Sequence, residues 1–373
     1  MSNNYGLAVK FGPSLGISAR NWAKMILTNG LISLKRMPRA FFTQFASIVG
    51  SPFRMYEKLK FDKQIKNFNL KKPSNFILGH WRSGTTYLHN ILCQDNQFGF
   101  ITMLQAAFPN SFMTFKIFRS FMKRFLPKNR PMDNVSMGIT LPQEDEMALS
   151  NLYPYSFYNA FYFPKKLRLL FLRFAKFENV AIKIKERWQK IYQYLLKKAS
   201  YYMSDKQLML KNPVNTARVK LLLNMFPKAK FIHIYRNPYI VFASTLNFYE
   251  KAIKPFALQD IPRPLLEKNI FWIYKTMMES YFKEKSLIPK ENLVEIKFED
   301  LEANPLEQVK YIYDGLNLDG YSRVKFKILR YIEKLKDYKK NIYYFTEEMV
   351  NKVKINWKFA IRKWKYDPPI TTY

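Results

Sequence analysis

The sequence predicts an α/β protein with a three-layer fold, in which a central parallel sheet is flanked by helices and carries a helical cap insertion. Two observations support this prediction: short apolar runs look like buried strands, and a helical stretch follows each of them. Strands that alternate with helices form parallel sheets, and their ligands bind beyond the carboxyl ends of the strands. The predicted strands are Asn75–Gly79, Gln207–Lys211, Lys230–Tyr235 and Asn292–Lys297.

Two regions are expected along the chain. In residues 1–72, apolar clusters alternate with basic residues and are separated by proline and glycine, which predicts short amphipathic helices. Basic helices of this kind either pack against the main domain or lie on a membrane surface. Residues 73–373 form the main domain, with a helical cap insertion at about 105–200 and C-terminal helices at about 322–367. The insertion of roughly 100 residues lies between the first two strands, and it is expected to carry helices of its own because it is too long for a loop.

The net charge of +34 is the most unusual bulk property of this 373-residue chain. A positive field of this size attracts nucleic acid, an anionic membrane surface or a small polyanionic cofactor, although a lysine-rich composition with solvated faces accounts for it equally well. The basic residues are spread along the chain and match no recognisable nucleic-acid-binding motif. No nucleic-acid partner is therefore predicted.

Cysteine and histidine are scarce. The single cysteine, Cys93, rules out internal disulfides and indicates a reducing compartment, and with three histidines few metal ligands remain, so no metal is predicted. Charged residues interrupt the hydrophobic N-terminal stretch, so neither a transmembrane helix nor a signal peptide is expected. We therefore predict a cytoplasmic protein, with peripheral contact at the inner membrane surface as an open alternative.

A glycine-rich turn follows the first predicted strand. Four residues separate Gly79 from Gly84, which is the glycine spacing of a phosphate-binding P-loop, and an amphipathic helix follows. Thr85 stands where an ATP-binding loop has lysine, so the turn keeps amides, hydroxyls and a helix N-terminus for an anion while Arg82 supplies the positive charge. An ordinary strand-to-helix turn is the alternative, but these residue types together favour a phosphate site. The predicted fold is accordingly P-loop-type.

A second anion site is predicted after the strand Lys230–Tyr235. The strand ends at Arg236, and Pro238 lies in the first turn of the following helix, where proline is favourable. Ser244 comes eight residues after Arg236 and can lie near the same face of that helix. Arg236 and Ser244 could hold a second phosphate together; alternatively, Arg236 ties the strand end to a neighbouring loop.

The two segments together resemble the nucleotide signatures of sulfotransferases that use 3′-phosphoadenosine 5′-phosphosulfate (PAPS). In that family, a loop of the form Arg/Lys-Ser-Gly-Thr-Thr holds the 5′-phosphosulfate, and an arginine and a serine eight residues apart hold the 3′-phosphate. The chain is similar to the bacterial branch of the family, and the resemblance covers about residues 75 to 367. The further segments that carry it are Gly79-His80, Leu88-His89-Asn90, Arg130–Asn134, Pro142–Glu146, Lys211-Asn212-Pro213, Lys297–Leu301, Trp357 and Trp364.

The resemblance implies a PAPS-dependent sulfotransferase that transfers a sulfuryl group to a hydroxyl acceptor. Lys211, at the carboxyl end of its strand, could add a cation near the transferred group, unless it forms a surface ion pair. Animal cytosolic relatives have lysine where this chain has Arg82, and their C-terminal Arg-Lys-Gly phosphate clamp has no counterpart here. The residues that the resemblance assigns to the donor are Arg82, Ser83, Gly84, Thr85, Thr86, Arg236 and Ser244.

A hydroxyl acceptor also needs a general base, for which sulfotransferases use histidine or glutamate. By resemblance Glu144 is the preferred base, although acidic residues at a helix start also favour the helix dipole without any catalytic role. His89, on the helix after the glycine-rich turn, is the second candidate. His233 alternates with aromatic residues along a strand and is expected to be structural.

The acceptor is expected to be apolar or amphipathic, such as a lipid or sterol-type alcohol. Residues 108–126 and 153–177 are rich in phenylalanine and tyrosine and are expected to form the helical cap, where these rings either fill the core or face the acceptor. The resemblance adds that bacterial members act on lipid, sterol-like and polyketide hydroxyls. The rival functions are a P-loop nucleotide kinase or NTPase, which Thr85 disfavours, and a polybasic nucleic-acid or membrane-binding protein.

Overall fold

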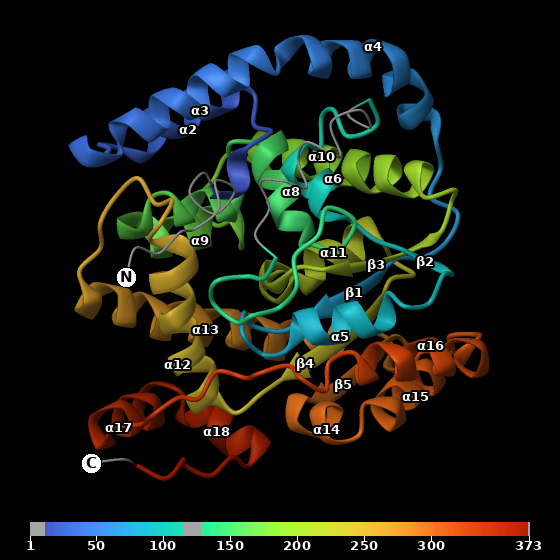
Figure 1. Ribbon diagram of the computed structural model, residues 1–373, viewed down its shortest axis with the longest axis vertical. Helices are drawn as coiled ribbons and strands as arrows, with labels where there is room; N and C mark the ends of the chain where they lie inside the picture. The colour runs from blue at the N-terminus through green and yellow to red at the C-terminus, as the bar shows by residue number, and fades with distance from the viewer. Residues whose placement is uncertain (1–11, 115–127, 372–373) are drawn as a thin grey trace. The chain divides into compact units, whose positions relative to one another are not determined.

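The computed structural model describes residues 12–114 and 128–371, whose elements are labelled in Figure 1. The chain divides into two compact units, both of them discontinuous in sequence. Unit 1 comprises Met1–Lys72, Gln97–Leu210 and Glu250–Pro262, and unit 2 comprises Pro73–Asn96, Lys211–Tyr249 and Arg263–Tyr373.

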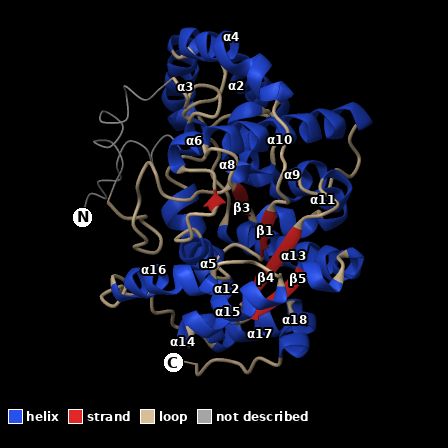
Figure 2. Ribbon diagram, turned by 90° about the vertical axis from the view of Figure 1, so that its right-hand side faces the viewer, coloured by secondary structure: helices blue, strands red, loops and turns tan. Residues whose placement is uncertain are grey.

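Within its described residues, unit 2 contains three parallel strands, β1 (Asn75–Leu78), β4 (Lys230–Tyr235) and β5 (Leu293–Lys297). β1 pairs with β4, where Phe76 lies opposite Phe231, and β4 pairs with β5. All residues of β1 are buried, as expected for a strand that helices cover on both faces. Figure 2 shows the strands in red among the surrounding helices.

The strands of unit 2 lead into helices as predicted. β1 continues through the glycine-rich turn into α5 (Thr85–Leu92), and β4 continues into α12 (Pro238–Phe248). The C-terminal helices share a buried aromatic core, in which Trp357 stacks on Tyr274 with ring centroids 3.9 Å apart. The other α-helices of this unit are α11 (Val219–Met225), α13 (Arg263–Glu284), α14 (Phe298–Ala303), α15 (Pro305–Gly315), α16 (Tyr321–Glu333), α17 (Glu347–Asn356) and α18 (Lys358–Trp364).

Unit 1 is mostly helical, which confirms that the long insertion after the first strand carries helices. Phe157, Tyr162 and Phe171 are fully buried, so these rings of the predicted cap fill its core. Residues 115–126 of the other predicted aromatic segment lie outside the described part of the chain. The α-helices of unit 1 are α2 (Ala19–Asn29), α3 (Met37–Val49), α4 (Ser51–Asn67), α6 (Met103–Ala107), α8 (Asp145–Leu152), α9 (Leu167–Phe174) and α10 (Ile182–Tyr202).

The strand predictions are confirmed with small differences at the ends. β3 (Gln207–Lys211) and β4 have the predicted bounds, whereas β1 ends one residue early, at Leu78, because Gly79 already belongs to the turn. β5 begins at Leu293, because Asn292 closes a short 3₁₀ helix. β2 (Phe98–Gly99), which pairs in parallel with β3, is absent from the prediction, since two residues are too few for a recognisable apolar run.

Candidate active site

The glycine-rich turn of unit 2 has a backbone that only particular residues can adopt. Gly79 and Gly84 have φ angles of 142° and 91°, and Arg82 has a φ of 73°, which is unusual for a residue with a side chain. A Cβ atom at Gly84 would overlap the Phe298 ring, and one at Gly79 would overlap the Ile234 carbonyl oxygen. Both glycines are therefore required where the sequence predicts them.

Hydrogen bonds hold both ends of this turn. The Gly79 N–H donates to the Thr216 hydroxyl at 2.8 Å, and the Ser83 N–H donates to the His80 carbonyl at 3.1 Å. Helix α5 then begins at Thr85, so its first backbone N–H groups are available at the end of the turn. A turn fixed in this way presents amides and a helix N-terminus to an anion.

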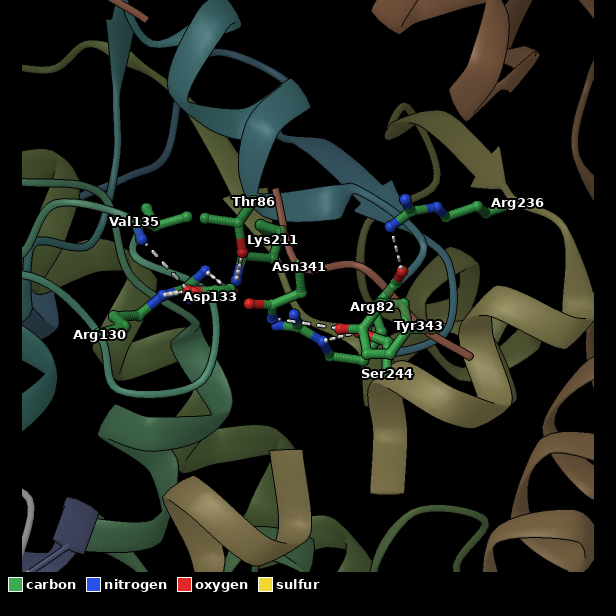
Figure 3. Close-up of polar contacts among 10 residues, drawn as sticks. All are labelled: Arg82, Thr86, Arg130, Asp133, Val135, Lys211, Arg236, Ser244, Asn341 and Tyr343. Carbon is green, nitrogen blue, oxygen red and sulfur yellow. Dashed lines mark hydrogen bonds and ion pairs between the residues drawn. The ribbon is translucent and has the colours of Figure 1, made fainter. Parts of the chain in front are cut away.

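Arg82 connects the turn to the second predicted anion site (Figure 3). Its Nε donates to the Ser244 hydroxyl at 2.8 Å, and its backbone carbonyl accepts a hydrogen bond from Nη1 of Arg236 at 3.3 Å. Ser244 lies on α12 and is 1% exposed. The fold thus brings together the two segments that the sequence analysis identified separately.

Ser244 has a further partner that the sequence analysis missed. The Tyr343 hydroxyl donates to the Ser244 hydroxyl at 2.9 Å, and the Asn341 side-chain amide donates to the Tyr343 hydroxyl at 3.2 Å (Figure 3). Both residues lie in the irregular segment between α16 and α17. No helical or strand periodicity marks this segment, and no motif of the resemblance includes it, so the sequence carries no signal for these contacts.

Arg236 is partly buried beneath the turn. Its guanidinium carbon lies 4.1 Å from the centroid of the Phe298 ring, and this ring also packs against Gly84. Burial lowers the pKa of the Arg236 guanidinium, the Glu299 and Glu302 carboxylates oppose that shift, and an arginine remains charged at neutral pH in either case. The site therefore holds a permanent cation in a poorly hydrated place, where charge interacts strongly with a bound anion.

Lys211 is buried at the end of β3, with 1% of its surface exposed. Its Nζ donates to the Thr86 hydroxyl at 3.3 Å, beside the first turn of α5. The alternative of a surface ion pair is thus wrong, because the side chain does not reach the surface. Lys211 adds a second cation next to the glycine-rich turn.

The histidines of unit 2 are all buried. His89 lies on α5, four residues after Thr85. His233 is 3.3 Å from a Glu295 carboxylate oxygen and stacks on Tyr281 with centroids 3.9 Å apart, which agrees with the structural role predicted for it. Burial lowers the pKa of His233.

His80, inside the turn, is the basis of a pH prediction. Burial lowers its pKa from 6.5 to about 4, although its Nδ1–H donates to the Trp81 carbonyl at 2.7 Å. The unfolded chain protonates the His80 imidazole more readily than the folded protein does. The stability that the neutral imidazole contributes is therefore complete above about pH 6.5 and is lost as the pH falls toward 4. We expect the His80 contribution to the free energy of unfolding to fall by about 2 kcal/mol between pH 7 and pH 5.

The measurement is urea unfolding of the wild type and of His80→Asn at several pH values. Asparagine keeps a donor near the position of Nδ1 but does not titrate, so its stability should depend less steeply on pH. Burial also lowers the pKa of His233, which makes both proteins less stable at low pH. The quantity to compare is therefore the difference between the two proteins in free energy of unfolding at each pH. Equal slopes for the two proteins would contradict the prediction.

The candidate base Glu144 lies in unit 1, at the N-cap of α8. It is partly exposed, makes no side-chain capping hydrogen bond, and accepts a hydrogen bond from the Tyr158 hydroxyl. The next two acids are fully buried: Asp145 accepts from the Tyr192 hydroxyl, and Glu146 accepts from the Ser156 hydroxyl at 2.7 Å. Of these three acids, Glu144 is the one with access to solvent.

Comparisons with known proteins identify the family of this chain. A model of the sulfotransferase family matches residues 73–323, so the chain belongs to that family. It is an enzyme, a sulfotransferase. The chain is 28% identical over 354 residues to omega-hydroxy-beta-dihydromenaquinone-9 sulfotransferase Stf3 of Mycobacterium bovis and to its namesake of Mycobacterium tuberculosis. The alignment covers 95% of this chain and 91% of each relative.

Solved structures show the same fold. Sulfotransferase STF9 from Mycobacterium avium is similar with a TM-score of 0.70 and 14% identity, covering 100% of both chains. Sulfotransferase STF1 from Mycobacterium tuberculosis is similar with a TM-score of 0.66 and 15% identity, covering 92% of this chain and 93% of that one. These findings confirm the predicted P-loop-type α/β fold and the resemblance to the bacterial branch of the family.

Proposed function

We propose that the chain transfers a sulfuryl group from PAPS to the hydroxyl of an amphipathic lipid. The observation that supports this most is the pair of hydrogen bonds by which Arg82 joins the glycine-rich turn to Ser244 and Arg236. PAPS carries anionic groups at both its 5′ and 3′ positions. The turn from Ser83 to Thr86 would bind the 5′-phosphosulfate, while Arg236 and Ser244 would bind the 3′-phosphate.

The chemistry is an in-line transfer. The acceptor oxygen forms a bond to sulfur, the bond from sulfur to the bridging phosphate oxygen breaks, and adenosine 3′,5′-bisphosphate leaves. Negative charge develops on that phosphate, where donors that are already in position lower the barrier most. Arg82, Lys211 and the N-terminus of α5, which all belong to unit 2, would stabilise that charge.

Calorimetric titration with adenosine 3′,5′-bisphosphate, AMP and ATP at matched ionic strength tests the donor. We expect the bisphosphate to bind much more tightly than AMP, because AMP leaves the site of Arg236 and Ser244 empty. Equal affinity for the bisphosphate and AMP would mean that this site does not bind the 3′-phosphate. Preference for ATP would instead favour the rival kinase or NTPase function.

For the general base we propose Glu144, which would take the proton of the acceptor hydroxyl. Replacing it with glutamine should lower kcat by about 10²- to 10⁴-fold, because glutamine cannot accept that proton. Affinity for the bisphosphate should not change, since the donor contacts are made by unit 2. Steady-state kinetics and calorimetry on the same preparation measure both quantities.

Two variants complete this test. Glu186→Gln removes a carboxylate from an exposed position on α10 and should leave kcat unchanged. His89→Gln tests the second candidate. A larger loss of kcat in His89→Gln than in Glu144→Gln would transfer the role of base to His89.

The acceptor class is proposed on two grounds. Stf3, by its name, acts on an omega-hydroxylated menaquinone, and that protein aligns with nearly the whole of this chain. Unit 1 also contains many buried aromatic side chains, including Tyr158, whose hydroxyl donates a hydrogen bond to Glu144. An assay with labelled PAPS should therefore yield sulfated product from an omega-hydroxylated isoprenoid quinone or a sterol, and none from a free sugar.

A further inference from the structure

Helix α3 exposes its apolar side chains and buries its small ones. The buried residues are Ala40, Thr43 and Ser47, which lie on one side of the helix. The opposite side consists of Phe41, Phe42, Phe45, Ile48 and Val49, which are 66%, 50%, 65%, 55% and 55% exposed. Helices that pack in a protein core have the reverse arrangement, with the large apolar face inward.

The exposed apolar surface continues into α4, which follows α3 directly after Gly50. Met55, Tyr56 and Leu59 on this helix are 65%, 55% and 80% exposed. Together with the five exposed residues of α3, they form what we call the N-terminal apolar face. Single exposed apolar residues are ordinary on protein surfaces, but a continuous series of large ones marks an interaction site.

Buried polar contacts attach these helices firmly to the rest of unit 1. Lys198 of α10 pairs with Glu57 of α4 at 2.5 Å, and both side chains are almost fully buried. The other carboxylate oxygen of Glu57 accepts from the N–H of Thr114 at 2.8 Å. On α2, the indole of Trp22 donates to the Ala40 carbonyl of α3 at 3.0 Å. The N-terminal apolar face is therefore part of a folded unit, with its inner side already packed.

Basic residues outnumber acidic ones in the helices that carry this face. From Ala19 to Val49 the sequence has no acidic residue and five basic ones, of which Arg36 pairs with Asp260 at 3.0 Å; the five are Arg20, Lys24, Lys35, Arg36 and Arg39. On α4, Lys58, Lys60 and Lys63 are exposed, while Glu57 is buried and Asp62 pairs with Lys66 at 2.7 Å. A rim of one sign of charge attracts an anionic surface, and it repels a second copy of the same chain.

We propose that the N-terminal apolar face docks on an anionic lipid bilayer. Its phenylalanine and aliphatic side chains enter the boundary between headgroups and acyl chains, and the surrounding lysines and arginines contact anionic headgroups. Among the described residues, no helix has the length and hydropathy of a membrane span. The proposal rests on the surface of unit 1 alone and does not depend on the proposed donor or acceptor.

Co-sedimentation of the full-length protein with vesicles tests the proposal. One set contains phosphatidylcholine with phosphatidylglycerol, and the other contains phosphatidylcholine alone. We expect clear binding to the anionic vesicles, weaker binding to the neutral ones, and weakening with added salt. The double variant Phe42→Ser/Phe45→Ser should bind the anionic vesicles about tenfold more weakly than the wild type, because it loses two apolar side chains that enter the bilayer.

The matched control is Phe326→Ser/Ile355→Ser, which changes two residues of unit 2 that are 68% and 76% exposed. It should bind vesicles like the wild type, and both double variants should keep the wild-type melting temperature and affinity for adenosine 3′,5′-bisphosphate. Failure of the wild type to bind anionic vesicles would overturn the proposal. The proposal would also be overturned if light scattering shows a wild-type dimer that Phe42→Ser/Phe45→Ser dissociates and the control variant does not. A second copy of the chain would then cover the N-terminal apolar face.

Discussion

Replacing Arg82 with alanine should lower kcat by about 10²- to 10³-fold, the size of effect seen when a preorganised charge-stabilising donor is removed from an active site. Arg82 is the residue of the glycine-rich turn whose side chain carries charge, and its guanidinium is already held in unit 2 by Ser244 at 2.8 Å. Its charge should matter most when the phosphate leaves, so kcat should fall more than donor affinity. Single-turnover kinetics with labelled PAPS would measure the chemical step directly.

Two further variants make the Arg82 experiment decisive. Arg362→Ala removes the same charge from an exposed position on α18 and should leave turnover unchanged, which separates a local effect from the general attraction of the +34 chain for anions. Arg82→Lys keeps the charge but loses Nε and should recover part of the activity. Full activity in Arg82→Ala would remove Arg82 from the mechanism.

Replacing Arg236 with alanine should weaken binding of adenosine 3′,5′-bisphosphate by about 10- to 100-fold, because a charge-assisted hydrogen bond to a phosphate is lost. Binding of AMP should hardly change, since AMP has no 3′-phosphate. The loss of selectivity between these two nucleotides is thus the expected signature, and calorimetry measures it. Arg362→Ala again serves as the control.

Arg236 also has a structural role, which the same experiment must separate from binding. Its Nη1 donates to the Arg82 carbonyl, so the variant could loosen the turn. In that case AMP and the bisphosphate would lose affinity together. Parallel losses for both nucleotides would contradict a specific role of Arg236 at the 3′-phosphate.

Much of the geometry of the proposed donor site could be predicted from the sequence, because local rules govern it. Gly79 and Gly84 are needed for positive φ angles and close packing, and such positions are visible as glycine spacing. The proximity of Arg236 and Ser244 to the turn follows from parallel strands, whose carboxyl ends lie at the same edge of a sheet. The strands themselves are short apolar runs, which the hydrophobic pattern reveals.

The residues that escaped prediction depend on tertiary packing. Tyr343 reaches Ser244 from an irregular segment about 100 residues away in sequence, and no local pattern encodes that approach. The sequence analysis included Phe298 only within the motif Lys297–Leu301. It could not predict that the Phe298 ring contacts both Gly84 and Arg236. The amphipathic character of α3 was predictable, but not that its apolar side would face outward, because periodicity identifies two faces without saying which one is buried.

The position of Phe298 bears on how this site could change in evolution. One ring touches the backbone of the turn at Gly84 and the guanidinium of Arg236, so it acts as a spacer between the two proposed phosphate positions. A smaller side chain there would let both move at once, whereas a larger one would push the turn outward. On the proposed assignment of the two phosphate positions, the size of residue 298 would help to set the phosphate-to-phosphate distance that the protein accepts, and inhibitors that bridge both positions would have to match that length.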